Sequence, residues 1–292
     1  MGNWKALTAG ERLLHFLATK VDGLRDMEFS KVTAASEITR GPAFGRFVDN
    51  CLILHCFGRL LQVAKYYRSR LEAAEALAAV ESYLVEYLNI SRGSCMGFKQ
   101  LSPLALEAAA ASSEANRRIK PAVRQEVLKP YRGVVTCYSC NGDLDVEAQK
   151  TVVVGEKETD NRLYLDLDHL WPHSYGGDSV AENLLPCCVF CNRAKGDSAS
   201  WEWVALQALL PEASFEITHL DDKHTSRGEK IALHMRAAFE YARTNGTTLK
   251  DAYKSIGPRQ PQVMLVDSSD TPDFFNLRVH DHAGSGISWR AR

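Results

Sequence analysis

The sequence predicts an α+β protein in three parts: a mostly helical first part, a small mixed core, and a helical extension with short strands. Two observations carry this prediction. Apolar residues recur at intervals of three and four through the first part, whereas β-like runs appear only after Pro121. Two Cys-x-x-Cys pairs then lie within the mixed core. We place the parts at residues 1–118, 119–210 and 211–292.

The composition is that of an ordinary globular protein. Hydrophobic residues make up 45% of the 292 residues and charged residues 24%, which excludes a disordered or collagen-like chain. The formal net charge is −1 and the isoelectric point is near 6.8. This balance excludes a protein that coats nucleic acid through a large excess of positive charge, but it leaves room for a local basic face.

The start of the chain carries no recognisable targeting signal. Residues 1–20 lack an uninterrupted apolar core, and eight cysteines are too few for a disulfide scaffold at this length. The most apolar run, Cys51 to Ala64, is interrupted by polar residues and is too short to span a membrane. We therefore expect a cytoplasmic protein without a membrane association, in which this run forms a buried helix or a helix that meets a partner.

The first part contains no motif that indicates chemistry. Its Ala-rich stretches at 72–88 and 104–118 have high helix propensity. We predict a helical domain for regulation, oligomerisation or partner binding. Its cysteines lack the spacing of metal ligands and are expected to be small buried hydrophobic residues: Cys51, Cys56 and Cys95.

The pattern changes after Pro121. The mixed core is predicted to contain a short helix, two strands and a second helix around the second cysteine pair, whereas the last part should contain two helices and two short strands. The first helix is predicted at 121–132, and the strands of the core at 151–156 and 162–170. In the last part, the helices are predicted at 229–244 and 248–255, and the strands at 262–266 and 274–280.

The two Cys-x-x-Cys pairs, Cys137 with Cys140 and Cys188 with Cys191, form the clearest motif. Each pair can present two thiolates on one side of a tight turn, and two pairs complete a tetrahedral zinc site. A redox dithiol needs one pair and a βαβ context that is absent here. Because a four-thiolate site is closed, we predict a structural Zn²⁺ that pins a helix start at Cys137 to the helix carrying Cys191. Cys187 lacks the spacing and is predicted to be a bystander.

Between the two pairs, the sequence combines the groups that phosphodiester hydrolysis needs. Asp168 and His169 are neighbours on a predicted strand, so one can hold a cation while the other activates water from a different direction. Two amides and a lysine follow: Asn183, Asn192 and Lys195. Taken singly, these residues also have ordinary interpretations, such as a strand-end carboxylate or an asparagine helix cap.

The order and spacing of these residues resemble the HNH nuclease family. The matching strings are Asp168-His169-x-x-Pro172-x-Ser174-x-Gly176-Gly177, then Asn183-Leu184-x-Pro186, then Cys188-x-x-Cys191-Asn192-x-x-Lys195-Gly196. The resemblance covers about residues 123–203 and implies a ββα-metal core with metal-dependent endonuclease activity. The spacings are also similar to those of the HNH domain in CRISPR RNA-guided effector nucleases.

This resemblance implies a role for each matched residue. His169 would be the general base, with its tautomer fixed by a backbone carbonyl bonded to the other ring nitrogen. Asp168 and Asn192 would bind one Mg²⁺ or Mn²⁺. Asn183 would clamp the loop that bears His169, and Lys195 would contact a phosphate near the cut.

The sequence departs from the compact family pattern before the catalytic strand. The acidic insert between Cys140 and Asp168 predicts a longer hairpin there. The last metal ligand is Asn192 where founding members have histidine, which favours Mg²⁺ or Mn²⁺ over a transition metal.

Two further histidine features are less readily assigned. His173 is either a phosphate contact or a surface histidine. His280-Asp281-His282 looks like a metal cluster, but three neighbours on a strand cannot all face one ion.

The expected substrate is double-stranded DNA. Residues 117–132 contain six basic residues and a single acidic residue, Glu126. The basic side chains either line a track for phosphates or form a solvated helical face. One ββα site cleaves one strand, so a monomer should nick DNA. The three-part layout favours a bacterial anti-phage defence or restriction effector that a regulatory protein or homodimerisation controls. A non-catalytic zinc-stapled nucleic-acid-binding or adaptor module and an RNA-cleaving nuclease stay open as alternatives.

Overall fold

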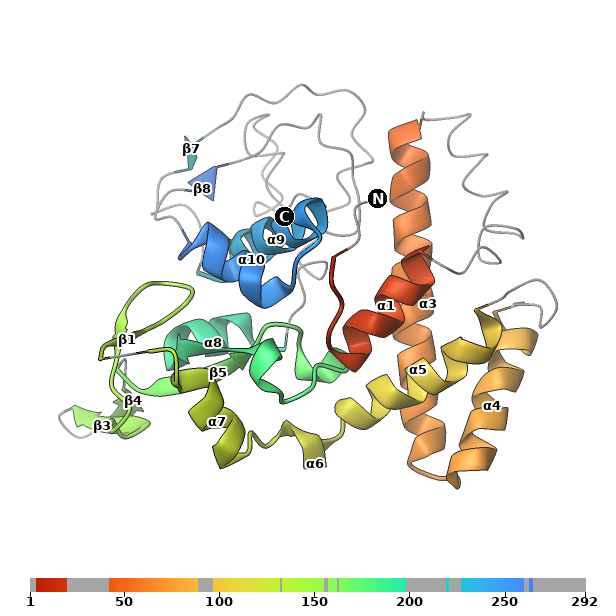
Figure 1. Ribbon diagram of the computed structural model, residues 1–292, viewed down its shortest axis with the longest axis horizontal. Helices are drawn as coiled ribbons and strands as arrows, with labels where there is room; N and C mark the ends of the chain where they lie inside the picture. Colours follow the sequence, from red (N-terminus) through yellow and green to blue (C-terminus); the bar gives the residue numbers. More distant parts are fainter. Residues whose placement is uncertain are drawn as a thin grey trace.

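Four helices gather at one end of the molecule, and most of the short strands lie at the other (Figure 1). The computed structural model describes residues 4–19, 42–88, 97–131, 133–154, 157–161, 163–197, 219–220, 227–259 and 263–264. The helices of the first end are α1 (Ala9–Thr19), α3 (Pro42–Arg68), α4 (Ala73–Glu86) and α5 (Phe98–Ala111). Two short helices, α6 (Glu114–Arg117) and α7 (Pro121–Leu128), lead from this end to the strands.

A capping box fixes the start of α1. Thr8 Oγ1 accepts a hydrogen bond from the Glu11 N–H at 3.2 Å, and Glu11 Oε2 accepts one from the Thr8 N–H at 2.9 Å. These reciprocal bonds satisfy two of the backbone donors that a helix start leaves free. Glu11 is consequently buried although it carries a carboxylate.

The apolar run of the sequence forms the second half of α3, as predicted for a buried helix. Ile53, Phe57, Leu60 and Ala64 are buried at intervals of three and four. Cys56 is buried in the same helix, as predicted, whereas the side chain of Cys51 and all of Cys95 lie outside the described residues. No helix within the described ranges is long and apolar enough to cross a membrane.

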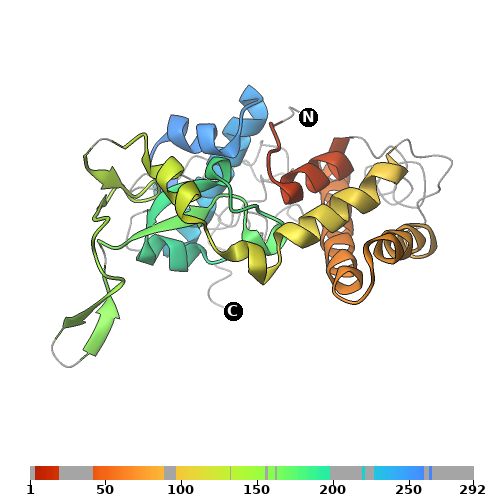
Figure 2. The ribbon, with the colours of Figure 1, turned by 60° about the horizontal axis from the view of Figure 1, so that its bottom comes forward.

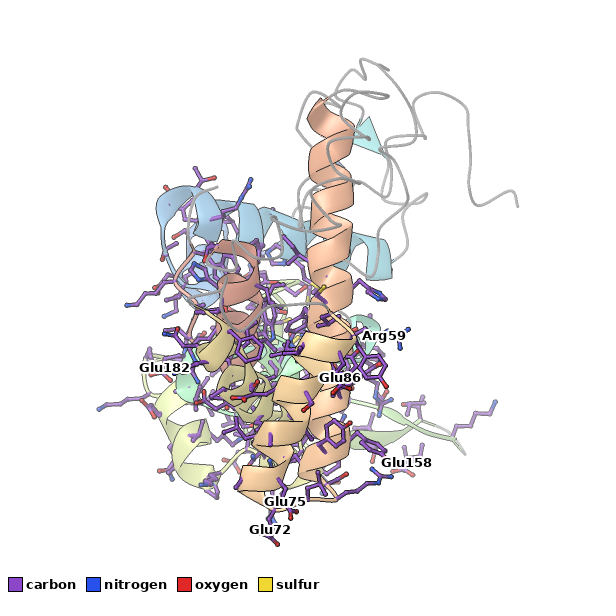
Figure 3. All side chains as sticks on the ribbon, turned by 90° about the vertical axis from the view of Figure 1, so that its right-hand side faces the viewer. Arg59, Glu72, Glu75, Glu86, Glu158 and Glu182 are labelled. Atoms are coloured by element: carbon purple, nitrogen blue, oxygen red, sulfur yellow. The ribbon has the colours of Figure 1, made fainter. Side chains whose placement is uncertain are left out.

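The Ala-rich stretch 72–88 forms α4, whose exposed residues are mainly alanine and glutamate. Its buried residues are Ala76, Val80 and Leu84, which fall on one stripe. Glu72, Glu75 and Glu86 are exposed at the start and end of α4 (Figure 3).

Besides α7, the described residues of the mixed core form three short antiparallel strand pairs and a second α-helix. Within the described residues the strands are β1 (Val135–Thr136), β2 (Asp143–Leu144), β3 (Thr151–Val154), β4 (Lys157–Asp160), β5 (Leu165–His169) and β6 (Leu184–Cys188), and the helix is α8 (Val189–Lys195). The predicted helix at 121–132 is confirmed as α7, which begins with Pro121 at a position that suits proline.

The insert between Cys140 and β5 forms a longer hairpin, as predicted. β3 pairs with β4 from Thr151–Asp160 to Val154–Lys157, and the hairpin projects away from the body of the molecule (Figure 2). At its base, Asp160 forms an ion pair with Arg193 of α8. The hairpin is thereby attached to the helix that carries the second cysteine pair.

The last part of the described chain packs over α8. It comprises α9 (Arg227–Asn245), α10 (Leu249–Ile256) and the pair β7 (His219–Leu220) and β8 (Val263–Met264). Both helical predictions for this part are confirmed. The predicted strand at 274–280 and the sequence His280-Asp281-His282 lie outside the described residues.

Buried residues from all three predicted parts belong to one hydrophobic cluster. It joins residues of α1, α3 and α5 to those of β5 and β6, and to those of α9 and α10. Backbone bonds also cross between the parts: the Gly10 N–H donates to the Gly176 carbonyl at 2.9 Å. The division at 118 and 210 stays a prediction, but the three parts share a core.

Candidate active site and metal centre

The site is built on β5, β6 and α8. β5 and β6 are antiparallel, with Leu165 opposite Cys188 and His169 opposite Leu184. α8 follows β6 directly and packs against β5. One end of this unit therefore carries Asp168 and His169, and the other carries the second cysteine pair.

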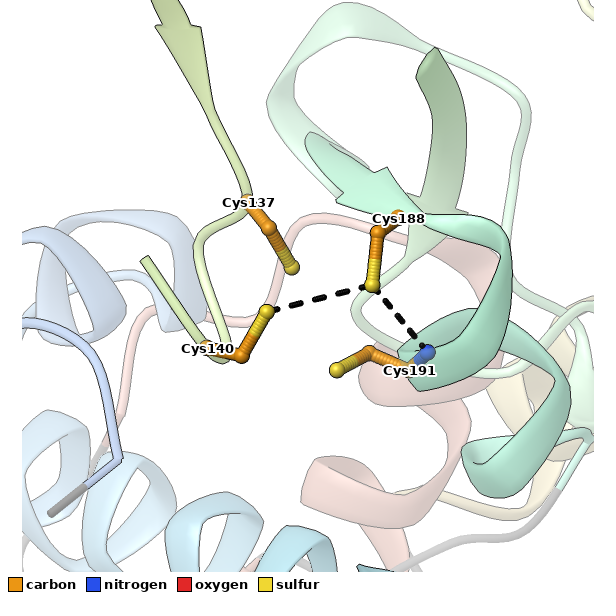
Figure 4. A group of neighbouring side chains, drawn as sticks. All are labelled: Cys137, Cys140, Cys188 and Cys191. Atoms are coloured by element: carbon orange, nitrogen blue, oxygen red, sulfur yellow. Dashed lines mark hydrogen bonds between the residues drawn. The ribbon is translucent and has the colours of Figure 1, made fainter. Parts of the chain in front are cut away.

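Four thiols converge at the base of the unit. The Sγ atoms of Cys137, Cys140, Cys188 and Cys191 all lie within 4.8 Å of one another, and their side chains face a common centre (Figure 4). The Cys140 and Cys188 sulfurs are 3.8 Å apart. Zinc–sulfur bonds of about 2.3 Å in a tetrahedron place sulfurs about 3.8 Å apart, so the four residues fit a Zn²⁺.

Local backbone geometry brings each pair together. Asn141 adopts a positive φ of 59°, and the Cys137 N–H donates to the Gly142 carbonyl at 2.9 Å, which closes a tight turn. Cys188 is the N-cap of α8, and its sulfur accepts from the Cys191 N–H. The expected helix start at Cys137 is wrong: Pro130 follows the end of α7, and Cys137 comes directly after β1.

The fifth cysteine of the region lies beside the four-thiol group without belonging to it. Cys187 is buried on β6, and its sulfur is 3.7 Å from that of Cys137. The group that could hold an ion contains Cys188 instead.

Hydrogen bonding among the four thiols, chiefly with Cys137, lowers the pKa of Cys140 to about 6, which favours the thiolate that zinc binds.

Asp168 is buried and held by two side chains. The Tyr138 hydroxyl donates to Asp168 Oδ2 at 2.6 Å, and Lys195 Nζ donates to Asp168 Oδ1 at 2.8 Å. Burial raises the pKa of Asp168, and the Lys195 ammonium opposes that shift. Lys195 Nζ also donates to the His169 carbonyl at 2.5 Å, so this lysine fixes the end of β5.

Asn192 contacts a different carboxylate from the expected one. Its Nδ2 donates to Asp166 Oδ2 at 2.7 Å, and none of the hydrogen bonds of the described chain joins it to Asp168. Because a carboxylate can only accept, this bond turns Nδ2 toward Asp166 and leaves Oδ1 available. Carboxylate and amide oxygens suit a hard divalent cation, so the donor types fit Mg²⁺ or Mn²⁺.

Sequence reasoning did not identify Asp166. A usable signal was present: Asp166 and Asp168 are two residues apart on a strand and therefore project from the same face, the face that α8 covers.

His169 lies at the end of β5 in a largely buried setting. Its Nε2 is 2.9 Å from Ser179 Oγ. Burial, followed by the positive charges of Lys195, His173 and Arg117, lowers the pKa of His169 to about 4. The imidazole is therefore neutral at neutral pH, as a proton acceptor must be. The resemblance implied a backbone carbonyl as the partner of the ring nitrogen, and this is wrong: the partner is a hydroxyl.

Asn183 bonds to the loop that follows His169. Its Oδ1 accepts from the Trp171 N–H at 2.7 Å, and its Nδ2 donates to the carbonyls of Trp171 and Asp178 at 3.1 and 3.0 Å. These three bonds span the loop from side to side and fix its shape. His173, in the same loop, is buried with its ring centroid 5.8 Å from that of His169, so it is not a surface histidine.

The structure thus brings Asp168, His169 and Lys195 together around the end of β5, with Asn183 behind the loop. Asn192 lies on the same unit but pairs with Asp166. The described core is thus an antiparallel strand pair that leads into a helix, a ββα arrangement with Asp-His at the end of its first strand and four thiols that could hold a metal ion at its base.

The comparison with known families identifies this core. Residues 154–201 match the model of the HNH endonuclease family, so this segment of the chain is similar to an HNH endonuclease domain. The match contains β5, β6 and α8, whereas Cys137 and Cys140 precede it. Neither the curated proteins nor the solved structures contain a match to the chain.

Proposed function

We propose that the protein is a metal-dependent endonuclease that hydrolyses phosphodiester bonds of DNA, with His169 as the general base. The observation that carries this proposal is the placement of His169 at the end of β5, beside Asp168 and ahead of a loop that Asn183 holds, within the segment that matches the HNH endonuclease family. General-base catalysis requires a neutral, positioned histidine next to the reacting phosphate.

The remaining residues take the roles that their chemistry allows. Asp168 and Asn192 would hold one Mg²⁺ or Mn²⁺, which when bound polarises the phosphate and stabilises the leaving oxygen. Lys195 keeps the Asp168 carboxylate in place through its 2.8 Å bond. The contact of Lys195 with a phosphate remains a prediction. Zn²⁺ on the four cysteines would be structural.

Positive charge near His169 supports a nucleic-acid substrate. Arg117 lies close enough to lower the pKa of both His169 and His173. It is exposed, as are Arg118 and Lys120 on the same segment and Lys129 beyond α7. α4, which carries Glu75 and Glu86, lies apart from α7 (Figure 1). DNA is therefore proposed to approach along the segment from α6 to α7.

The wider context is also a proposal. One site cleaves one strand, so we expect nicking, with double-strand breaks requiring a dimer. The helical first part is proposed to serve a regulatory partner or a second copy, in a bacterial anti-phage defence or restriction effector. The cytoplasm is the expected location because reducing conditions keep the four thiols free for zinc.

The experiment incubates the full chain with supercoiled plasmid DNA and, separately, with single-stranded RNA, in Mg²⁺, Mn²⁺ or EDTA. The proposal predicts metal-dependent conversion of supercoiled to nicked DNA, with no product in EDTA. Cleavage of RNA alone would favour the RNA-cleaving alternative. Binding of DNA without cleavage under every metal condition would favour the adaptor alternative.

A further inference from the structure

Ser179 lies between the proposed general base and the backbone of another part of the chain. We propose that Ser179 is a positioning residue: its hydroxyl connects His169 Nε2 to the Asn116 carbonyl and holds the imidazole in the tautomer whose Nδ1 carries the lone pair. This inference rests on the proposed function, because it concerns the group proposed to accept a proton from water.

The number of protons that the imidazole, the hydroxyl and the carbonyl can each donate fixes the direction of both hydrogen bonds made by Ser179 Oγ. Ser179 Oγ is 2.7 Å from the Asn116 carbonyl oxygen and 3.4 Å from that of Arg117. Carbonyl oxygens only accept, so the single hydroxyl proton of Ser179 points to Asn116. Ser179 Oγ then offers only lone pairs to His169 Nε2, 2.9 Å away. Nε2 must therefore carry the imidazole proton.

The other ring nitrogen is left as the reactive atom. Within the described part of the chain, no hydrogen bond reaches His169 Nδ1. A neutral imidazole with Nε2–H has its lone pair on Nδ1, which is the state that accepts a proton from water. Ser179 thereby selects the nitrogen that acts, without itself touching the reacting atoms.

Both ends of the connection are anchored. Asp178, next to Ser179, accepts a hydrogen bond from the Ala9 N–H at 2.8 Å through Oδ2, and its carbonyl accepts one from Asn183 Nδ2. Asn116 belongs to α6, and its Nδ2 donates to the Ala110 carbonyl of α5 at 2.8 Å. The helical first part therefore contributes a backbone acceptor to the proposed catalytic histidine.

The test compares Ser179→Ala with Ser179→Thr, which keeps a hydroxyl. Ser174→Ala is the matched control. Ser174 Oγ also donates to a backbone carbonyl, that of Asp197, but no described hydrogen bond joins it to His169. The first readout is the tautomer of His169, measured by ¹⁵N NMR of histidine-labelled full-length protein and assigned with His169→Gln. The second readout is the single-turnover rate of plasmid nicking.

We expect Nε2–H in the wild type, in Ser179→Thr and in Ser174→Ala, and a mixture with Nδ1–H in Ser179→Ala. The nicking rate of Ser179→Ala should fall roughly tenfold, as for other residues that orient a functional histidine, while its unfolding temperature stays near that of Ser174→Ala. An Nδ1–H wild type, or a Ser179→Ala tautomer unchanged from the wild type, overturns the inference. If the wild type cleaves nothing, the proposed function fails while the tautomer still decides the role of Ser179.

Discussion

The two side chains that donate hydrogen bonds to Asp168 lie before and after it in the sequence. Tyr138 lies between the first two cysteines, and Lys195 lies at the end of α8. A buried carboxylate is stable only when hydrogen-bonded or paired, and here both oxygens are satisfied. The Tyr138 hydroxyl therefore links the turn between the first two cysteines directly to the end of β5.

Replacing Tyr138 by phenylalanine removes that hydroxyl and keeps the ring. Asp168 Oδ2 then loses a buried hydrogen bond, so the free energy of unfolding should fall by about 1–3 kcal/mol. Denaturant unfolding measures the change. Tyr253→Phe is the control, because Tyr253 is buried against Tyr138 with ring centroids 5.0 Å apart and makes no hydrogen bond to Asp168 among the described contacts. Equal losses in the two variants would contradict this role of Tyr138.

The sequence identified those candidate site residues whose positions are marked by the spacing of a family motif. Asp168, His169 and Asn183 were found because family spacing marks them, and Asn183 does bond to the loop. Ser179 and Tyr138 were missed because their partners are 63 and 30 residues away, respectively. No local pattern encodes a bond between a loop hydroxyl and a carbonyl of a distant helix.

At the scale of elements, the four-thiol group joins the turn after β1 to the junction of β6 and α8. Cys188 ends β6 and caps α8, so an ion there fixes the angle between the strand and the helix. Asp166 and Asp168 on β5 face that helix, which carries Asn192 and Lys195. An ion bound to the four thiols would therefore help to set the geometry of the proposed active site.

Cys188→Ala should lose zinc, whereas Cys187→Ala should keep about one zinc per chain. The reason is that only Cys188 belongs to the group of four converging sulfurs. Elemental analysis measures the zinc, and thermal unfolding should show a lower transition temperature for Cys188→Ala. Zinc retained by Cys188→Ala but lost by Cys187→Ala would show that the ligand set is wrong.

The contact between α9 and the first cysteine pair predicts a pH dependence of stability. His234 of α9 is buried, stacks on Tyr138 with ring centroids 6.0 Å apart, and bonds to the Gly257 carbonyl. Burial lowers its pKa below 6.5, with a smaller contribution from Arg259, whereas the Gly257 bond and Cys191 oppose the shift. Below pH 6.5 the unfolded chain therefore binds more protons, and stability falls as the pH falls.

His234→Gln removes this contribution. Between pH 7.5 and 6, the free energy of unfolding of the variant should depend less steeply on pH than that of the wild type, by up to about 1.4 kcal/mol per pH unit. Denaturant unfolding at several pH values measures both slopes. The two slopes would coincide if His234 were protonated equally in the folded and unfolded chains.

Periodicity was a good guide to most elements, as α4, α7, α9 and α10 show. It failed at Cys137, where a helix start was expected and a strand and turn are found. The two-residue strand β1 is too short to produce a pattern, and its pairing with β2 depends on the turn that the cysteines make.

At the scale of the molecule, the helical first part supports the loop after His169. Lys65 Nζ of α3 donates to the Ser174 carbonyl at 2.7 Å, the Ala9 N–H donates to Asp178, and the Gly10 N–H donates to the Gly176 carbonyl. Nothing in the sequence indicated these contacts, because α1 and α3 carry no chemical motif. A helical part that could be a separate regulatory domain is also a scaffold for the proposed active site.

Gly10→Ala tests this support. A Cβ at residue 10 would lie 1.8 Å from the Tyr175 carbonyl oxygen and 2.5 Å from Trp171 Nε1, so α1 or the loop must move. We expect a loss of about 1–3 kcal/mol in the free energy of unfolding together with slower plasmid nicking.

Gly58→Ala is the matched control for Gly10→Ala. It is a helical glycine of α3 with nothing within 4 Å of the added Cβ, and the change should stabilise the protein by about 0.5–1 kcal/mol. A Gly10→Ala protein as stable and active as Gly58→Ala would contradict the close packing of α1 on the loop.

In the proposed reaction, His169 accepts the proton of the attacking water. The most direct test is the single-turnover rate at which supercoiled plasmid is nicked in Mg²⁺ or Mn²⁺ by the wild type, by His169→Ala, and by His55→Ala, which changes an exposed histidine of α3. We predict that His169→Ala lowers the rate by about a hundredfold or more while His55→Ala leaves it unchanged. Equal, metal-dependent nicking by the wild type and His169→Ala would contradict the claim.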